Sequence, residues 1–79
     1  RISRFAIARE FRAHFGVSPS RYVIERRLEH VRRRIAAGDG LAEAALAAGF
    51  SDQSHMTRHF RSANGLPPGR WRAVTTAQP

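Results

Sequence analysis

Arginine and other hydrogen-bond donors gather on one side of the segment 53–64. Successive residues of a helix are rotated by about 100°, so these side chains point away from the apolar residues Met56 and Phe60 or flank them. They are Ser54, His55, Thr57, Arg58 and Arg61. A guanidinium group can donate two parallel hydrogen bonds to a guanine base or to a phosphate. The pattern alone predicts either a nucleic-acid-binding face or a helical hairpin with a solvated polar surface.

Other chemistry that these residue types could support is incomplete. His55 and His59 lie one helical turn apart, but two ligands without a nearby carboxylate or cysteine make a weak metal site. Asp52, Ser54 and His55 are neighbours on one short helix, which cannot aim a base at a nucleophile across a cleft. The chain also has no glycine-rich phosphate loop. We therefore predict a protein that is not an enzyme and that uses no metal or cofactor.

The polar face needs a second helix to hold it in place. An alanine-rich stretch, 42–48, ends at Gly49, where a helix can close in the left-handed conformation. Ser51 or Asp52 can then cap the next helix. The segment 41–65 therefore predicts two helices joined by a tight turn, an arrangement in which one helix braces and the other enters the major groove of DNA.

Three further helices are predicted, over residues 3–15, 19–37 and 68–74. Each begins at a capping residue or a proline, and the first two have apolar residues spaced by one helical turn. No segment has the pattern of a strand, so we expect an all-α fold. The residues predicted to form its core are Ile7, Phe11, Leu28, Val31, Ile35, Ala45, Phe50, Met56, Phe60 and Trp71.

A short internal repeat links the two ends of the chain. Residues 11–19 and 60–68 share the pattern Phe-Arg-x-x-x-Gly-x-(Ser/Pro)-Pro, and Arg9 matches Arg58. The helix between them has about 19 residues and spans about 28 Å. With its loops, it separates the two repeats by about one turn of DNA, roughly 34 Å. The repeat therefore predicts two recognition helices that enter successive major grooves.

Phe5 and Arg9 are the candidates for base contacts on the first helix. Phe5 lies off the apolar stripe and beside Arg9, where it could contact a thymine methyl group while Arg9 binds guanine or phosphate. The alternative is that Phe5 covers a partner domain.

The composition favours a polyanionic partner. The chain has 79 residues with a formal net charge of +8, and all 14 of its basic residues are arginine. Nucleic acid is the first candidate partner, an anionic membrane surface is the second, and a merely soluble basic surface is the alternative. The absence of cysteine excludes disulfides, and no apolar run reaches the roughly 20 residues of a membrane span. We expect one cytoplasmic domain, cut from a longer protein because it begins at Arg1.

Two segments, GFSDQSHMTRHFR (49–61) and NGLPPGRWR (64–72), resemble the signature of AraC/XylS-type bacterial transcription regulators. The segment 11–19, with Tyr22, Arg27 and Leu28, is similar to the middle portion of that family. The resemblance covers essentially the whole chain. It implies two homeodomain-like helix-turn-helix units joined by a long linker helix, with 1–16 as the recognition helix of an incomplete first unit and 41–65 as the second unit. The resemblance also implies a regulatory domain that binds an effector, and we expect that domain to lie outside this chain.

The resemblance also implies a role for each polar residue. Base contacts are expected from Phe5, Arg9, Gln53, Ser54, His55 and Arg58, and contacts to the DNA backbone from Arg4, Arg12, Ser51, Thr57 and Arg61. Three positions depart from the family pattern, because Ala8 offers no hydrogen bond, Ala44 replaces a larger aliphatic residue and Arg34 replaces leucine.

Two hypotheses about function follow. The first is sequence-specific binding to double-stranded promoter DNA in transcription activation, with RNA polymerase as a further partner. The alternative is a basic helical adaptor that binds a protein or an anionic surface without sequence preference. Base identity matters only under the first hypothesis.

Overall fold

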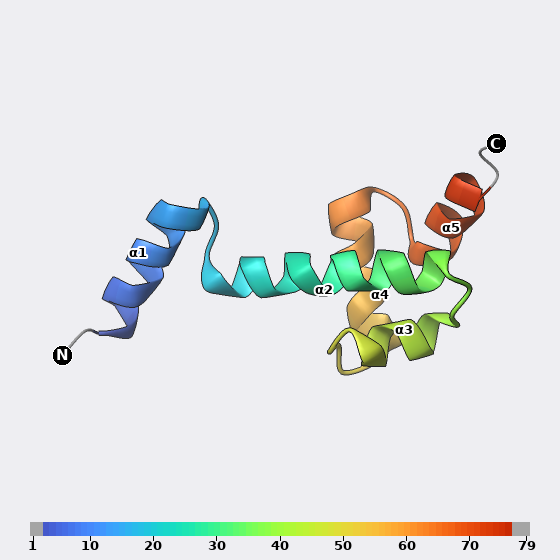
Figure 1. Ribbon diagram of the computed structural model, residues 1–79, viewed down its shortest axis with the longest axis horizontal. Helices are drawn as coiled ribbons and strands as arrows, with labels where there is room; N and C mark the ends of the chain where they lie inside the picture. The colour runs from blue at the N-terminus through green and yellow to red at the C-terminus, as the bar shows by residue number, and fades with distance from the viewer. Residues whose placement is uncertain (1–2, 77–79) are drawn as a thin grey trace.

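The computed structural model describes residues 3–76, which form five helices and no strand. The helices are α1 (Arg4–Phe15), α2 (Pro19–Ala36), α3 (Leu41–Ala47), α4 (Gln53–Asn64) and α5 (Pro68–Thr76). The molecule is elongated, with extents of 51 × 25 × 18 Å, because α2 separates α1 from the other three helices (Figure 1). The all-α prediction is confirmed. None of the described helices is both long enough and apolar enough to cross a membrane.

The long helix α2 is the element on which the others are arranged. It begins at Pro19, after Ser18, whose hydroxyl accepts a hydrogen bond from the backbone N–H of Arg21 at 3.2 Å. Its start contacts α1, and its second half packs against α3, α4 and α5 (Figure 1). The predicted stripe is buried on that second half, since Leu28, Val31 and Ile35 are fully inaccessible to solvent.

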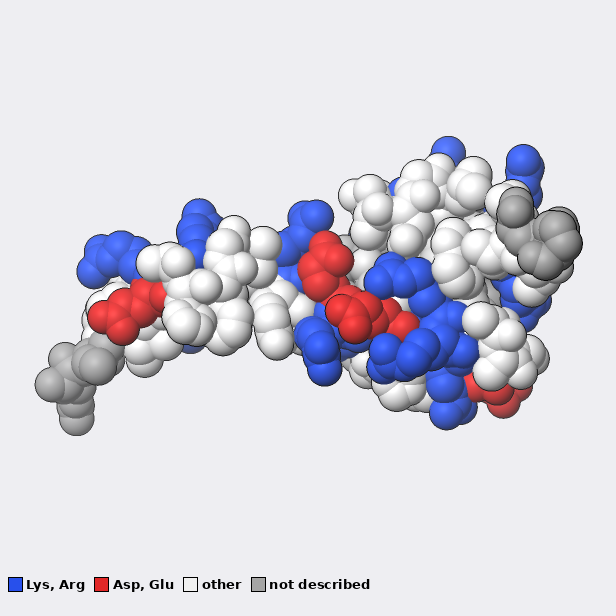
Figure 2. Space-filling view, turned by 45° about the horizontal axis from the view of Figure 1, so that its top comes forward, with Lys and Arg blue, Asp and Glu red and all other residues white. Residues whose placement is uncertain are grey.

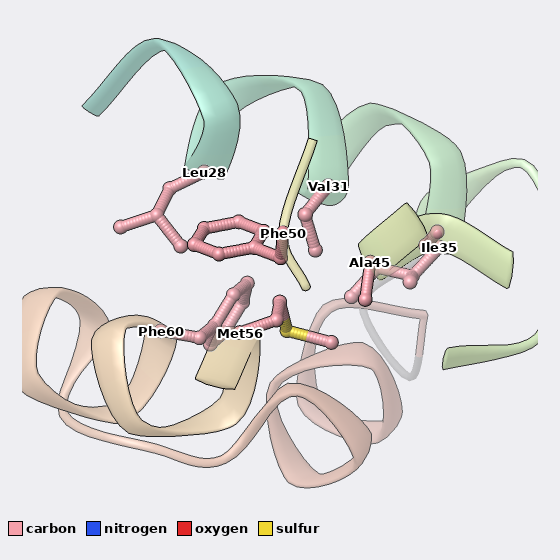
Figure 3. Close-up of a cluster of buried hydrophobic side chains, with 8 residues drawn as sticks. Leu28, Val31, Ile35, Ala45, Phe50, Met56 and Phe60 are labelled. Carbon is pink, nitrogen blue, oxygen red and sulfur yellow. The ribbon is translucent and has the colours of Figure 1, made fainter. Parts of the chain in front are cut away.

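The hydrophobic core lies between α2, α3, α4 and α5. Phe50 sits between α2 and α4, where its ring faces Leu28 and Phe60 (Figure 3). Trp71 of α5 closes the core from the other side, with its ring centroid 5.6 Å from that of Phe60 in an edge-to-face arrangement. The buried core residues are Leu28, Val31, Ile35, Ala44, Ala45, Phe50, Met56 and Phe60. Eight of the ten predicted core residues therefore belong to this cluster or pack against it.

The turn between α3 and α4 depends on Gly49. Its φ is +98°, and a Cβ at this position would lie 3.1 Å from Nε of Arg27. Both the backbone conformation and the nearby arginine therefore favour glycine. Asp52, rather than Ser51, caps α4 by accepting a hydrogen bond from the backbone N–H of His55 at 2.7 Å.

The prediction that Ile7 and Phe11 belong to the core is wrong. Ile7 is 55% exposed, and α1 has no buried residue. Phe11 is half-buried in a separate aromatic cluster, with its ring centroid 4.3 Å from Phe15 and 5.4 Å from Tyr22. The physical reason is position: α1 packs against the start of α2 and stands apart from α3, α4 and α5 (Figure 1), so its apolar stripe faces no other described element.

The internal repeat has the same backbone at both ends of the molecule. α1 ends at Gly16 with φ +81° and ψ −8°, and α4 ends at Gly65 with φ +79° and ψ −11°. In each case the glycine N–H donates to the carbonyl four residues earlier, Arg12 or Arg61. The two helices therefore have the same length and the same C-terminal cap, although their burial differs.

Candidate nucleic-acid interface

The outer face of α4 carries side chains that the fold leaves free. Met56 and Phe60 are buried against the core, and Gln53, Ser54 and Arg58 on the other side are exposed. Within residues 3–76, no hydrogen bond or ion pair holds these three side chains. A row of unengaged donors on a capped helix can bind the edges of bases in a major groove.

His55 and Thr57, which flank this face, are half-buried. Nδ1 of His55 lies 3.2 Å from the hydroxyl of Ser51, and its ring meets that of Phe50 edge to face at 5.4 Å. The hydroxyl of Ser51 is therefore directed at His55. This arrangement fixes the imidazole and leaves its other ring nitrogen, Nε2, as the atom that could bind DNA.

The pKa of His59 is lowered from its ordinary value of 6.5. Burial against the core is the main cause, because it disfavours the charged imidazolium, and the nearby cations His55, Arg58 and Arg21 act in the same direction. The His55 and His59 rings lie 5.0 Å apart. No group of three or more potential metal ligands occurs within residues 3–76, and we derive no metal chemistry from this pair.

Three of the four candidate residues of α1 line one shallow groove. Phe5 is 75% exposed, and Arg4, Arg9 and Arg12 are exposed as well. Ser3 caps the helix by accepting a hydrogen bond from the backbone N–H of Ala6 at 3.1 Å. The residues that line the groove are Phe5, Ala8, Arg9, Arg12 and Ser18. The structure thus brings Phe5, Arg9 and Arg12 together on one face, and Arg4 lies outside the groove.

The two candidate helices are held apart by α2. Both α1 and α4 begin at the lower edge of the view in Figure 1 and end at its upper edge. The 18 residues of α2 extend over about 27 Å at about 1.5 Å per residue. That length is slightly shorter than one turn of B-DNA, about 34 Å, and the two short loops add to the separation.

Charge is distributed differently over the linker helix and the two candidate helices. All ion pairs found within residues 3–76 involve arginines of α2, and Glu25, Glu29 and Asp39 are their partners. Figure 2 shows red acidic side chains set among blue arginines in the middle of the molecule. By contrast, α4 contains no acidic residue. A phosphate backbone that approaches α4 therefore meets cations whose charge is not neutralised by a neighbour.

Sequence patterns did not indicate a small cleft between the first half of α2 and the second half of α4. Arg21, Glu25 and His59 contribute its polar lining, over a floor that includes Ile24 and Leu28. The one sequence feature that could have pointed to this cleft is the position of His59, one helical turn after His55. Arg32 also bridges these helices, donating to Oδ1 of Asn64 at 3.2 Å. These contacts set the position of α4 relative to α2.

Comparison with known proteins shows the family of the chain. A family model described as a helix-turn-helix domain matches residues 1–73. The HTH-type transcriptional activator RhaS of Pectobacterium carotovorum is 38% identical over 61 residues, which are 76% of this chain and 22% of RhaS. The putative AraC-like transcription regulator of Streptomyces lividans is 32% identical over 76 residues, 95% of this chain and 25% of that protein.

A third relative is the HTH-type transcriptional regulator ExsA of Pseudomonas aeruginosa, 35% identical over 63 residues, 78% of this chain and 23% of ExsA. The chain thus spans about a quarter of the length of these curated relatives. No solved structure matches it. From the family match, these relatives and the five-helix fold, we conclude that the chain belongs to the AraC/XylS family and is a helix-turn-helix DNA-binding domain.

Proposed function

We propose that this domain binds a specific DNA sequence with α1 and α4 in successive major grooves, and that the protein to which it belongs activates transcription. The observation that carries the proposal is the outer face of α4, where Ser54 and Arg58 are exposed and no acidic residue competes for them. The position of α1 at the other end of α2 and the length of α2 support a second contact about one DNA turn away.

Each proposed contact follows from what a side chain can reach. On α4, Gln53, Ser54, His55 and Arg58 contact bases, and Arg58 supplies a bidentate contact to guanine worth about 1–3 kcal/mol in discrimination. On α1, Arg9 and Phe5 contact bases. Backbone phosphates are bound by Arg4, Arg12, Ser51, Thr57 and Arg61, which lie beside these residues. The domain acts by binding and carries out no catalysis.

Activation and a contact with RNA polymerase are proposed by analogy with relatives. RhaS is named a transcriptional activator, and VirF of Yersinia enterocolitica, 31% identical over 64 residues, is named a virulence regulon transcriptional activator. A DNA target in bacteria places the protein in the cytoplasm. The alternative of a nonspecific basic adaptor is not favoured, since it gives no reason for the exposed, unpaired donors on α4.

A pair of arginines on α4 provides the first test. We expect Arg58→Ala to relax base preference at one position of the site, because it removes a base contact. Arg61→Ala should weaken binding to all sequences alike and reduce the salt dependence by about one unit of slope. The measurement is selection of bound duplexes from a random pool, followed by titrations of the enriched and a random duplex at two salt concentrations.

The two variants are matched controls for each other, since both remove one exposed arginine from the same helix. Equal losses on specific and random duplexes for Arg58→Ala would show that Arg58 does not recognise a base. A wild-type selection without an enriched sequence, with binding that disappears as salt rises, would support the nonspecific adaptor.

A further inference from the structure

A second cationic site lies on the side of α2 that faces away from α4. Arg26, His30 and Arg33 are spaced by one helical turn and form a stripe along that face. Together with Arg27 and with Ala48 at the end of α3, they line a hollow of about 250 Å³. Neither the proposed DNA contacts nor the hydrophobic core uses Arg26, His30 or Arg33, whereas Ala48 packs against the core and Arg27 lies over the ring of Phe50.

The cations of this hollow are only weakly neutralised. Arg26 and Arg33 share one carboxylate, Glu29, at 3.9 and 3.8 Å, close to the outer limit for an ion pair. Both arginine side chains are about two-thirds exposed, at 65% and 68%. Pairs of this kind contribute little to stability. The three arginines that line the hollow thus face one acidic neighbour, and a second anion would be attracted to the site.

One of the cations is held in position by the fold. The guanidinium of Arg27 lies 5.7 Å from the centroid of the Phe50 ring, a cation–π contact. Its side chain also packs beside Gly49, which leaves little room for it to move. A cation fixed in this way loses little conformational entropy when it binds an anion, which increases affinity.

The stripe does not lie on the face proposed for DNA. Arg26 is rotated by about 200° from Leu28 on α2, and Leu28 belongs to the core shared with α4. Ser54 and Arg58 point away from that core on α4. α2 therefore lies between the stripe formed by Arg26, His30 and Arg33 and the proposed DNA face, although Ala48, on the other wall of the hollow, is only three residues before Ser51.

The length of the stripe distinguishes a protein segment from a small anion. Arg26 and Arg33 are seven residues apart, so their Cα atoms are separated by about 10.5 Å along the helix. Glu29 lies between them and already contacts both guanidinium groups, so a single small anion that bridged the two arginines would lie beside this carboxylate and be repelled by it. A helix or extended strand with acidic residues spaced over two helical turns can pair with the whole stripe.

We propose that the stripe formed by Arg26, His30 and Arg33 is a docking surface for an acidic segment of a partner protein. Because α2 separates this surface from the proposed DNA face, the domain can bind the segment and DNA together. The claim that the docking surface lies away from DNA rests on the proposed function. The charge complementarity between the stripe and an acidic segment does not. Binding of an acidic segment can therefore be tested on the free chain.

The experiment uses a hexaglutamate peptide as the probe and the isotope-labelled chain at about 150 mM salt, where long-range attraction is screened. We expect amide chemical shifts to change for residues 26–33 and 47–49, and not for 53–58. Arg33→Glu should lower the affinity for the peptide at least about fivefold, because it replaces an attraction by a repulsion. Arg33→Gln, which keeps the helix propensity, should give a smaller loss in the same direction.

The matched control is Arg70→Glu on α5, which changes the net charge equally at an exposed position outside the hollow. Arg70→Glu should lower the affinity for the peptide less than about twofold. Arg33→Glu and Arg70→Glu should change the affinity for DNA by the same factor. Equal peptide losses for the two variants, or shifts centred on Arg9 and Arg58, would overturn the proposal in favour of diffuse attraction. A selective loss of DNA affinity in Arg33→Glu would instead make this face a DNA surface. If the chain binds the peptide at α2 but has no preference for any DNA sequence, the proposed function is refuted and the docking surface is not.

Discussion

At the scale of single residues, the side chains of α4 divide into two groups by what holds them. His55 is fixed by Ser51 and Phe50, and His59 lies against Phe50 with a ring separation of 6.1 Å. Ser54 and Arg58 have no such partner within residues 3–76. The histidines therefore shape the edge of the interface, while the free donors remain available to bind DNA.

The lowered pKa of His59 predicts how stability depends on pH. The folded chain binds a proton at His59 less readily than the unfolded chain, whose histidine pKa is about 6.5. The free energy of unfolding should therefore be highest above that value and should decrease as the pH falls below it. We expect the slope of Tm between about pH 7.5 and about pH 5.5 to be smaller in His59→Gln than in the wild type.

His30→Gln is the control for this measurement, since it removes a histidine from the outer face of α2 rather than from the cleft beside α4. Identical slopes for His59→Gln and the wild type would mean that burial of His59 does not affect its protonation.

At the scale of elements, α1 and α4 are alike in length and capping and unlike in packing. Phe60 of α4 is fully buried, whereas its counterpart in the repeat, Phe11 of α1, is half-buried. The same sequence pattern thus forms the same helix end in two different environments. Local residues determine the cap, and the neighbouring elements determine the burial.

The repeat therefore provides a matched pair for a stability test. Phe60→Ala should lower the free energy of unfolding by about 3–5 kcal/mol, because it leaves a cavity in the core. Phe11→Ala should cost roughly 1 kcal/mol, since it removes mainly the aromatic contacts with Phe15 and Tyr22. Urea denaturation followed by circular dichroism would measure both. Similar losses for the two variants would contradict the difference in burial.

The turn at Gly49 allows a second test of element geometry. Gly49→Ala should destabilise the domain by about 1–3 kcal/mol, because alanine is strained at positive φ and its Cβ would lie close to Nε of Arg27. Gly40→Ala is the control, since Gly40 has φ −66° and a Cβ there would also lie 3.1 Å from a side-chain atom, Oε1 of Glu43, so the two variants differ mainly in backbone conformation. Equal Tm values for wild type and Gly49→Ala would argue against this turn conformation.

Sequence patterns predicted the helices and the hydrophobic core between α2, α3, α4 and α5 well, because apolar spacing, caps and prolines act locally. They predicted the apolar stripe on α2 and the packing of Trp71 against the core. They also predicted α5, which extends only two residues past the expected end. They failed for Ile7 and Phe11, since a periodic apolar stripe does not reveal whether another element covers it. They also missed the hydrogen bond between Arg32 and Asn64, which joins residues 32 positions apart.

At the scale of the whole molecule, α2 sets the distance and the angle between the two candidate DNA-binding helices. Its rigidity comes from regular hydrogen bonding, and Arg21–Glu25 and Arg33–Glu29 are ion pairs one turn apart on its surface. If both helices bind one duplex, the length of α2 must match the spacing of the two contacted base blocks.

An insertion into α2 tests this coupling. Seven helix-forming residues placed between Tyr22 and Val23 add about 10.5 Å and rotate α1 by only about 20°. A shift of about three base pairs along DNA rotates the groove by about 100°, so α1 can no longer enter it. We expect selection from a random pool to recover only the block bound by α4, with its sequence unchanged. An unchanged two-block site would show that α2 does not set the spacing.

The uneven burial of the two repeats also has a consequence for how the chain opens in solution. α1 contains no buried residue, whereas α4 contributes Met56 and Phe60 to the core. Segments with few buried contacts open with small free energies, so amide hydrogens of α1 should exchange with solvent much faster than those of α4. The difference should decrease when DNA is added, because a bound duplex would cover α1. The entropy lost in ordering α1 would then make its contribution to affinity decrease with temperature faster than that of α4.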